Sequence, residues 1–109
     1  MKSSVIKALQ NLSSKEEQLF VNVIEHGSMH VEIYKPINID PQTPHNQDEL
    51  YVIINGSGDF ILNGSRSTFQ QGDVIFVPAL AEHRFENFTE DFATWAIFYG
   101  PEGGEKKKK

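Results

Sequence analysis

The close spacing of turn-forming residues constrains the fold of this chain more than any other feature. From residue 18 onward, clusters of Gly, Pro, Asn, Asp and Ser recur about every 8–12 residues and separate short runs of β-branched and aromatic residues. Roughly eight or nine strands are indicated, the clearest at residues 20–25, 29–34, 50–54, 59–62, 65–69, 74–77, 83–86 and 92–99. Strands at this spacing are typical of a sandwich or barrel. The sequence therefore predicts an all-β fold, a small β-barrel or jelly roll.

The two ends of the chain are predicted to lie outside this barrel. Residues 3–12 fit a short helix capped by Ser3 or Ser4, whose apolar side carries Val5, Ala8, Leu9 and Leu12. After Gly100, the sequence PEGGEKKKK has nothing to bury, which indicates a mobile tail. We therefore expect a helical segment at 1–14, the β-barrel domain at 15–100 and a disordered tail at 101–109.

Length, charge and composition exclude several classes of protein. A chain of 109 residues with 39% hydrophobic residues can form one globular domain. The net charge of −5, with four of the ten Lys and Arg in the terminal KKKK, argues against a nucleic-acid partner. The absence of cysteine excludes disulfides, Cys-ligated zinc and thiol catalysis. The first residues contain no long apolar run, so we expect no signal peptide, no membrane partner and a cytoplasmic location.

His45 and Glu49 precede the strand at residues 50–54 and are the first candidates for chemistry. In one straight strand their side chains would lie about 13 Å apart, too far for a single ion. Helical i, i+4 spacing would bring them together, but the strand that follows leaves little room for a helix. A three-residue turn at residues 46–48 would instead place them opposite one another, with Cβ atoms about 4.5–5.5 Å apart. The sequence thus favours a hairpin here.

The alternation of side chains along the strand indicates what surrounds Glu49. Glu49 shares a face with Tyr51 and Ile53, so a carboxylate pointing into the barrel would have apolar neighbours and would need a cation or another partner. The alternative is that Glu49 begins the strand at the rim and stays in water, and the spacing leaves both possibilities open. His83, far downstream, is equally compatible with an ordinary histidine at the end of a strand.

The segment from Thr43 to Asn87 resembles the cupin superfamily in its small single-domain form. The first motif of that family contains a His-x-His pair, a Glu three or four residues later and a Gly after six more, and its second half is matched by His45, Glu49 and Gly56. The second motif is matched in spacing by Gly72, Pro78, His83 and Asn87. The resemblance implies a double-stranded β-helix, or jelly-roll barrel, that binds a metal ion.

The resemblance also implies which residues hold the metal ion. The family's ligand positions fall on His45, Glu49 and His83, whereas its first histidine falls on Thr43 and the glycine of its second motif on Leu80. Two imidazoles and one carboxylate suit Fe(II) and also Mn, Ni or Zn. Thr43 and Gln47 are further candidates for weak oxygen ligands, and His30 is a possible substitute ligand.

Side chains alternate between the two faces of a strand. Counting along the strands from these three residues predicts a small, apolar pocket beside them. The expected lining comprises Thr43, Gln47, Tyr51, Ile53, Phe76, Phe85 and Trp95, for each of which ordinary core packing is the alternative. Tyr51 is the nearest candidate catalytic residue, as a proton donor. Such a pocket would suit an aromatic or short organic acid that binds the metal ion through its oxygens.

Both faces of several strands are apolar, which indicates a second layer or a partner. Leu50, Val52 and Ile54 cannot all face water favourably, and cupins similar to this chain pair back to back, so we expect a homodimer. Three functions are open: a metal-dependent oxygenase or isomerase of a small organic acid, a non-catalytic module that senses or sequesters a small molecule, and a structural domain. The sequence carries no attached DNA-binding segment, so a one-chain transcription factor is not expected.

Overall fold

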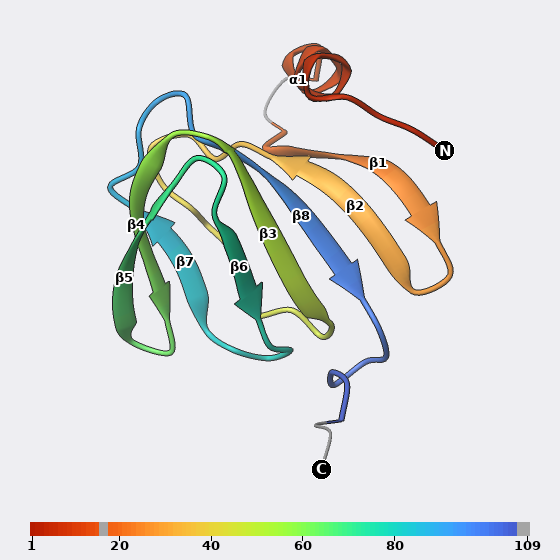
Figure 1. Ribbon diagram of the computed structural model, residues 1–109, viewed down its shortest axis with the longest axis vertical. Coiled ribbons are helices and arrows are strands. Elements are labelled where there is room, and N and C mark those ends of the chain that lie inside the picture. The colour runs from red at the N-terminus through yellow and green to blue at the C-terminus, as the bar shows by residue number, and fades with distance from the viewer. Residues whose placement is uncertain (16–17, 107–109) are drawn as a thin grey trace.

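The computed structural model describes residues 1–15 and 18–106 and has the predicted all-β architecture. The described residues form one helix and eight strands: α1 (Val5–Ser13), β1 (Phe20–His26), β2 (Met29–Tyr34), β3 (Asp48–Asn55), β4 (Ser57–Leu62), β5 (Ser65–Gln70), β6 (Val74–Val77), β7 (His83–Glu86) and β8 (Ala93–Tyr99). Figure 1 shows them as a jelly-roll barrel with the helix at one end. The predicted fold and the predicted strand positions are therefore confirmed.

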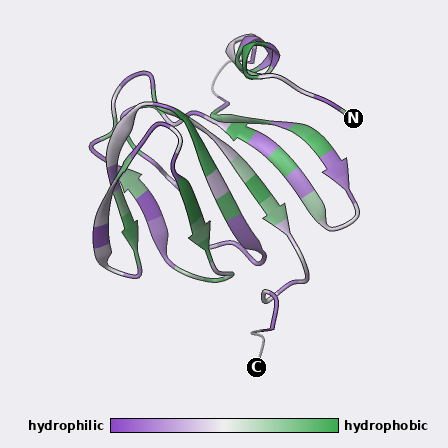
Figure 2. Ribbon diagram, viewed as in Figure 1, coloured by the Kyte–Doolittle hydropathy of each residue, from purple (hydrophilic) through white to green (hydrophobic). Residues whose placement is uncertain are grey.

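The strands form two sheets that face one another. A five-stranded sheet has the order β1-β2-β8-β3-β6 and a three-stranded sheet the order β5-β4-β7, with antiparallel pairing throughout the described residues. Hydrophobic residues concentrate on β3, β4, β6 and β8 (Figure 2). The core between the sheets is mainly aromatic and includes Tyr51, Phe60, Phe69, Phe85 and Phe92. Burial of these rings is the main driving force that closes the barrel.

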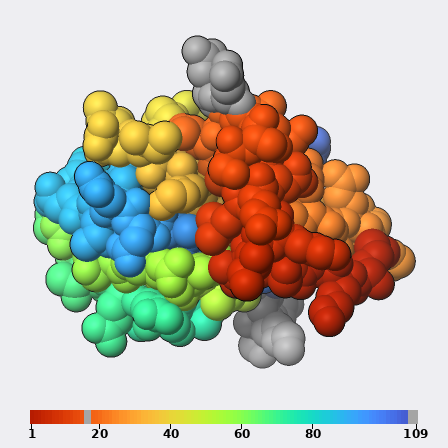
Figure 3. Space-filling model, turned by 90° about the horizontal axis from the view of Figure 1, so that it is seen from above, coloured from red at the N-terminus to blue at the C-terminus, as the bar shows by residue number. Residues whose placement is uncertain are grey.

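Helix α1 covers the outer face of the strands at one end of the molecule. The Ser4 side chain accepts a hydrogen bond from the Lys7 amide, as predicted for a capping serine. Ala8 and Leu12 pack with Val21 and Ile33 in a second apolar cluster. Figure 3 looks onto the helix where it lies beside the hairpin of β1 and β2. Among the described residues, no helix is long and apolar enough to cross a membrane.

Two residues predicted to line the pocket lie on the outer face instead. Trp95 packs against the cluster beneath helix α1. Phe76 is 48% exposed and pairs in register with Leu50. Ala96 and Phe98 of β8 face the core, so alternation along the strand directs Trp95 outward. The prediction for these two side chains was therefore wrong.

The segment after β8 returns to the loop that precedes β3. The amide of Gly103 donates to the Asn46 carbonyl at 2.7 Å, and the amide of Glu105 donates to Asp48 Oδ2 at 2.8 Å. Gln47 Nε2 donates to the Gly100 carbonyl at 2.9 Å. No sequence pattern indicates these contacts. The division of the chain at residues 14 and 100 stays a prediction.

Leu80 adopts a left-handed backbone conformation with φ of 69° while its side chain is 61% exposed. This conformation costs a non-glycine residue about 1–2 kcal/mol, whereas glycine adopts it freely but loses about 0.5–1 kcal/mol through the unfolded state. We expect Leu80→Gly to raise the free energy of unfolding by up to about 1 kcal/mol in a urea titration. Ala79→Gly, at a position without positive φ, should lower it instead. A loss of stability in Leu80→Gly would contradict this account.

Candidate metal centre

Three predicted ligand residues meet at one end of the barrel interior. Glu49 is the second residue of β3 and His83 the first residue of β7, while His45 lies in the irregular segment before β3. His83 Nε2 is 3.4 Å from Glu49 Oε1, and His45 Nε2 is 3.8 Å from the same oxygen. One donor atom from each residue lies within 4.8 Å of the others, and His30 does not belong to this group.

The approach of His45 to Glu49 does not use the predicted hairpin. Residues 41–47 are not a strand, residues 46 and 47 form a bend, and Asp48 already belongs to β3. The His45 carbonyl instead accepts a hydrogen bond from the Leu80 amide at 2.7 Å, and Asp48 Oδ1 accepts one from Ala79 at 2.9 Å. Pro41 and Pro44 in this segment prevent a regular ladder of strand hydrogen bonds. The segment is held instead by the loop between β6 and β7.

The donor atoms of Glu49 and His83 are buried without hydrogen bonds. Within residues 1–15 and 18–106, neither Glu49 oxygen has a partner, nor does His83 Nε2, and Glu49 is 1% exposed. His83 Nδ1 lies 2.9 Å from the Ala81 carbonyl, which only accepts, so Nδ1 carries a proton, and when the ring is neutral Nε2 directs a lone pair toward Glu49. Lone pairs of Glu49 and His83 thus face one another. A cation satisfies both, so these residues fit a divalent metal ion.

The surroundings shift the pKa values of His45, His83 and Tyr51. Burial lowers the pKa of His45 despite the nearby Glu49 carboxylate, which favours a neutral imidazole able to bind a metal ion. At His83 burial also acts to lower the pKa, but Glu49 and the Ala81 carbonyl outweigh it and the net shift is upward. Burial and the charge of Glu49 raise the pKa of Tyr51, so its phenol stays protonated.

A buried network that the sequence did not reveal supports the cluster from the side of residues 40–42. Asp40 accepts hydrogen bonds from the Tyr34 hydroxyl, from Gln42 Nε2 at 2.7 Å and from the Phe85 amide at 2.8 Å. Gln42 Oε1 accepts from the Tyr51 hydroxyl at 2.7 Å and lies 3.2 Å from His45 Nε2. Asp40 and Gln42 stand among prolines without a recognisable motif, so only the folded structure identifies them.

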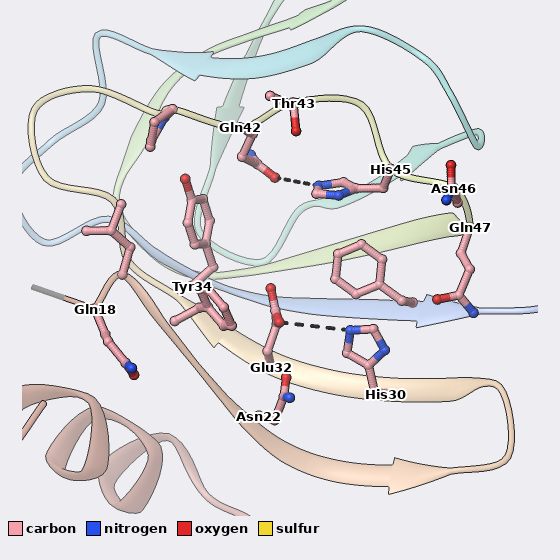
Figure 4. Close-up of a pocket in the computed structure, with 14 residues that line it drawn as sticks. Gln18, Asn22, His30, Glu32, Tyr34, Gln42, Thr43, His45, Asn46 and Gln47 are labelled. Carbon is pink, nitrogen blue, oxygen red and sulfur yellow. Dashed lines mark hydrogen bonds and ion pairs between the residues drawn. The ribbon is translucent and has the colours of Figure 1, made fainter. Parts of the chain in front are cut away.

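A cavity of about 730 Å³ opens beside the cluster, and His45 is part of its wall. Figure 4 shows His30 and Glu32 reaching it from β2, and Gln42, Thr43 and His45 facing them from the segment before β3. Of the predicted lining residues, Thr43 and Gln47 do line this cavity. Gln47 also donates to the Ser28 carbonyl.

The other inward-facing residues of the predicted pocket belong to the packed core. Tyr51, Ile53 and Phe85 are buried there and do not line the cavity. The aromatic rings fill the space between the two sheets, so the open volume lies over the inner face of β1 and β2. The cavity wall consequently carries more amides and charged groups than the predicted apolar pocket.

Glu32 gives the site a testable pH dependence. Burial, with a smaller contribution from Glu49, raises the pKa of Glu32 from 4.5 to about 7. Between these values the folded chain holds a proton that the unfolded chain has released, so stability falls as the pH rises through this window. We expect Glu32→Gln to raise the free energy of unfolding by about 1–3 kcal/mol at pH 8 and to change it little at pH 4.

Urea titrations of metal-free protein at the two pH values measure this effect. Glu90→Gln is the matched control, because Glu90 is exposed and its replacement should alter neither value by more than about 0.5 kcal/mol. The same pH dependence in wild type and Glu32→Gln would show that Glu32 is not the group responsible.

Comparisons with known proteins agree on the domain type. The family model Cupin_2, described as a cupin domain, matches residues 30–99. An uncharacterized protein of Streptomyces coelicolor is 26% identical over 104 residues, 94% of this chain and 99% of that protein. The HTH-type transcriptional activator RhaS of Mannheimia succiniciproducens is 36% identical over 55 residues, 50% of this chain and 20% of that protein. The solved structure of a cupin 2 conserved barrel domain protein from Leptotrichia buccalis has a TM-score of 0.64 and 21% identity, covering 79% of this chain and 43% of that one.

Proposed function

This chain belongs to the cupin domain family, and we propose that it binds a divalent metal ion through His45, Glu49 and His83, beside a cavity that takes a small organic acid. The carrying observation is the buried, unpartnered pair of Glu49 and His83, whose lone pairs face one another. Without a metal ion, this buried carboxylate could be partnered only by a proton on His83 Nε2, which the raised pKa of His83 favours. Fe, Mn, Ni and Zn are all compatible with this donor set.

In this proposal each part of the site has a separate task. When bound, the metal ion supplies a Lewis acid for the oxygens of an organic acid. The Ala81 carbonyl orients the His83 ring, and the Asp40–Gln42 network holds Tyr51 and His45. The amides that line the cavity supply donors for a polar ligand. The Tyr51 hydroxyl, which donates to Gln42 at the cavity wall, is the candidate proton donor for an oxygenase or isomerase reaction.

A non-catalytic binding module is the second candidate. The match to the transcriptional activator RhaS supports it, although the matched region is a fifth of that protein. In this case the cavity would recognise the same kind of organic acid without converting it. Oxygen consumption and product analysis with a panel of catechols, keto acids and thiols distinguish the enzyme from the non-catalytic module. Turnover by the metal-loaded protein supports the enzyme, and binding without turnover supports the module.

Elemental analysis of protein purified without a His-tag tests the metal site directly. We expect about one Fe, Mn, Ni or Zn ion per chain after loading, and its loss in Glu49→Gln and in His83→Ala. Circular dichroism spectra of the two variants check that the fold is retained. A wild-type protein that takes up no metal under loading conditions would refute the proposal.

The outer face of β6 supports the further proposal of a homodimer. Val74 and Phe76 are exposed on this edge strand of the five-stranded sheet, beside the outward side chains of β3. Exposed apolar residues on an edge strand favour pairing with another chain. We expect light scattering at micromolar concentration to give the mass of two chains, and Phe76→Glu to reduce it to one. A wild-type mass of one chain would contradict the dimer.

A further inference from the structure

The side-chain amide of Gln42 has a fixed orientation beside the three proposed ligands. Its Nε2 donates to Asp40 Oδ2 at 2.7 Å, and a carboxylate only accepts, so the nitrogen must point toward Asp40. Its Oε1 therefore points the other way, where it accepts from the Tyr51 hydroxyl and lies 3.2 Å from His45 Nε2. The dashed line from Gln42 to His45 in Figure 4 marks this approach.

Two of the three separations between donor atoms fit the coordination shell of one ion, and the third fits a wider angle at the metal. Two ligand atoms each about 2.1 Å from a metal are about 3.0 Å apart at a right angle and about 3.4 Å apart at the tetrahedral angle. The observed separations are 3.2 Å between Gln42 Oε1 and His45 Nε2, 3.4 Å between His83 Nε2 and Glu49 Oε1, and 3.8 Å between His45 Nε2 and Glu49 Oε1. The oxygen of Gln42 thus stands at ligand distance from a nitrogen already assigned to the metal.

We propose that Gln42 Oε1 is a fourth protein ligand of the metal ion, an inference that rests on the proposed function of the site. His45 Nε2 cannot donate a proton to Gln42 and bind a metal ion at the same time. When it binds the ion, one lone pair of Gln42 Oε1 is released, while the other still accepts from Tyr51. The residue next to Gln42 is Thr43, where the family pattern has its first histidine, so the amide supplies the donor that this chain otherwise lacks.

A neutral oxygen in this position has consequences for metal choice. The protein donors become two imidazole nitrogens and two oxygens, and the single carboxylate leaves the site with a net positive charge when it holds a divalent ion. Carbonyl-type oxygen suits Mn²⁺, whereas imidazole suits Zn²⁺. Removing the Gln42 oxygen should therefore weaken the binding of Mn²⁺ more than that of Zn²⁺.

Metal titrations of Gln42→Ala and Thr43→Ala test this assignment. Metal-free protein is titrated with Mn²⁺, with the free ion measured by electron paramagnetic resonance, and with Zn²⁺ in competition with a chelator. We expect Gln42→Ala to bind Mn²⁺ at least about tenfold more weakly, with a smaller change for Zn²⁺. Thr43→Ala should change either affinity by less than about threefold. Thermal unfolding without metal establishes that both variants fold.

The visible absorption of Co²⁺-loaded protein distinguishes a ligand from a residue that only positions His45. We expect the Co²⁺ bands to change in Gln42→Ala but to keep their intensity in Tyr51→Phe, which loses a hydrogen bond to Gln42 but retains its oxygen. Unchanged bands in Gln42→Ala would overturn the assignment, even if affinity falls, and so would unchanged Mn²⁺ affinity. A wild-type chain that binds neither ion would instead refute the proposed function.

Discussion

Replacing Phe85 by alanine is expected to lower the free energy of unfolding by about 3–5 kcal/mol. Phe85 is 1% exposed and its ring centre lies 4.7–5.1 Å from those of Tyr51, Phe60, Phe69 and Phe92. The substitution would remove aromatic contacts with both sheets and leave a cavity at the centre of the core. Because a domain of this size is stable by about 5–15 kcal/mol, this loss is a large part of the total.

Urea titration monitored by Trp95 fluorescence measures this loss. Phe20→Ala is the matched control: Phe20 is half exposed at the start of β1, so its replacement should cost less than about 1 kcal/mol. Equal effects of the two substitutions would show that the aromatic core does not dominate stability. The Phe85 amide also donates to Asp40, so the same variant shows whether the core supports the network beside the proposed metal centre.

Binding of the metal ion is expected to stabilise the folded chain strongly. At a free metal concentration of about 100 times Kd, mass action raises the free energy of unfolding by about 2.7 kcal/mol. For a domain of this size the increase corresponds to a rise in Tm of about 10–20 °C. The physical reason is that the ion would bind the buried donor atoms of Glu49 and His83, which are brought together only by folding.

Thermal melts with and without metal measure this shift in wild type and two histidine variants. His83→Ala should lose most of the shift, whereas His26→Ala should retain it, because His26 is exposed in the turn between β1 and β2. An equal shift in His83→Ala would place the metal ion elsewhere. The comparison holds the number of removed histidines constant, so weak binding by any imidazole cannot produce the difference.

The strands could be predicted from local sequence because turn residues and alternation are local signals. The positions of His45, Glu49 and His83 followed from the resemblance to a family, and the cluster in the structure is compatible with a metal ion. The prediction of a hairpin at residues 46–48 was wrong because the contact that holds His45 comes from Leu80, far along the chain. Local signals cannot show such a contact.

The outward orientation of Phe76 and Trp95 was missed for a related reason. Alternation shows which residues share a face, but the pairing of Val52 with Trp95 and of Leu50 with Phe76 decides which face is inside. Asp40 and Gln42 were missed because they come together with β3 and β7 only in the folded chain. The catalytic assignment of Tyr51 stays a prediction.

The contact of residues 100–105 with the loop before β3 has a practical consequence for studying this protein. Asp48 and Gln47 sit between His45 and Glu49 in the chain and are hydrogen-bonded to Glu105 and Gly100. The C-terminal segment therefore holds Gln47, which lies two residues from each of these proposed ligands. We therefore expect a purification handle or fluorescent label joined to this segment to disturb the proposed metal site more than one joined at the N-terminus.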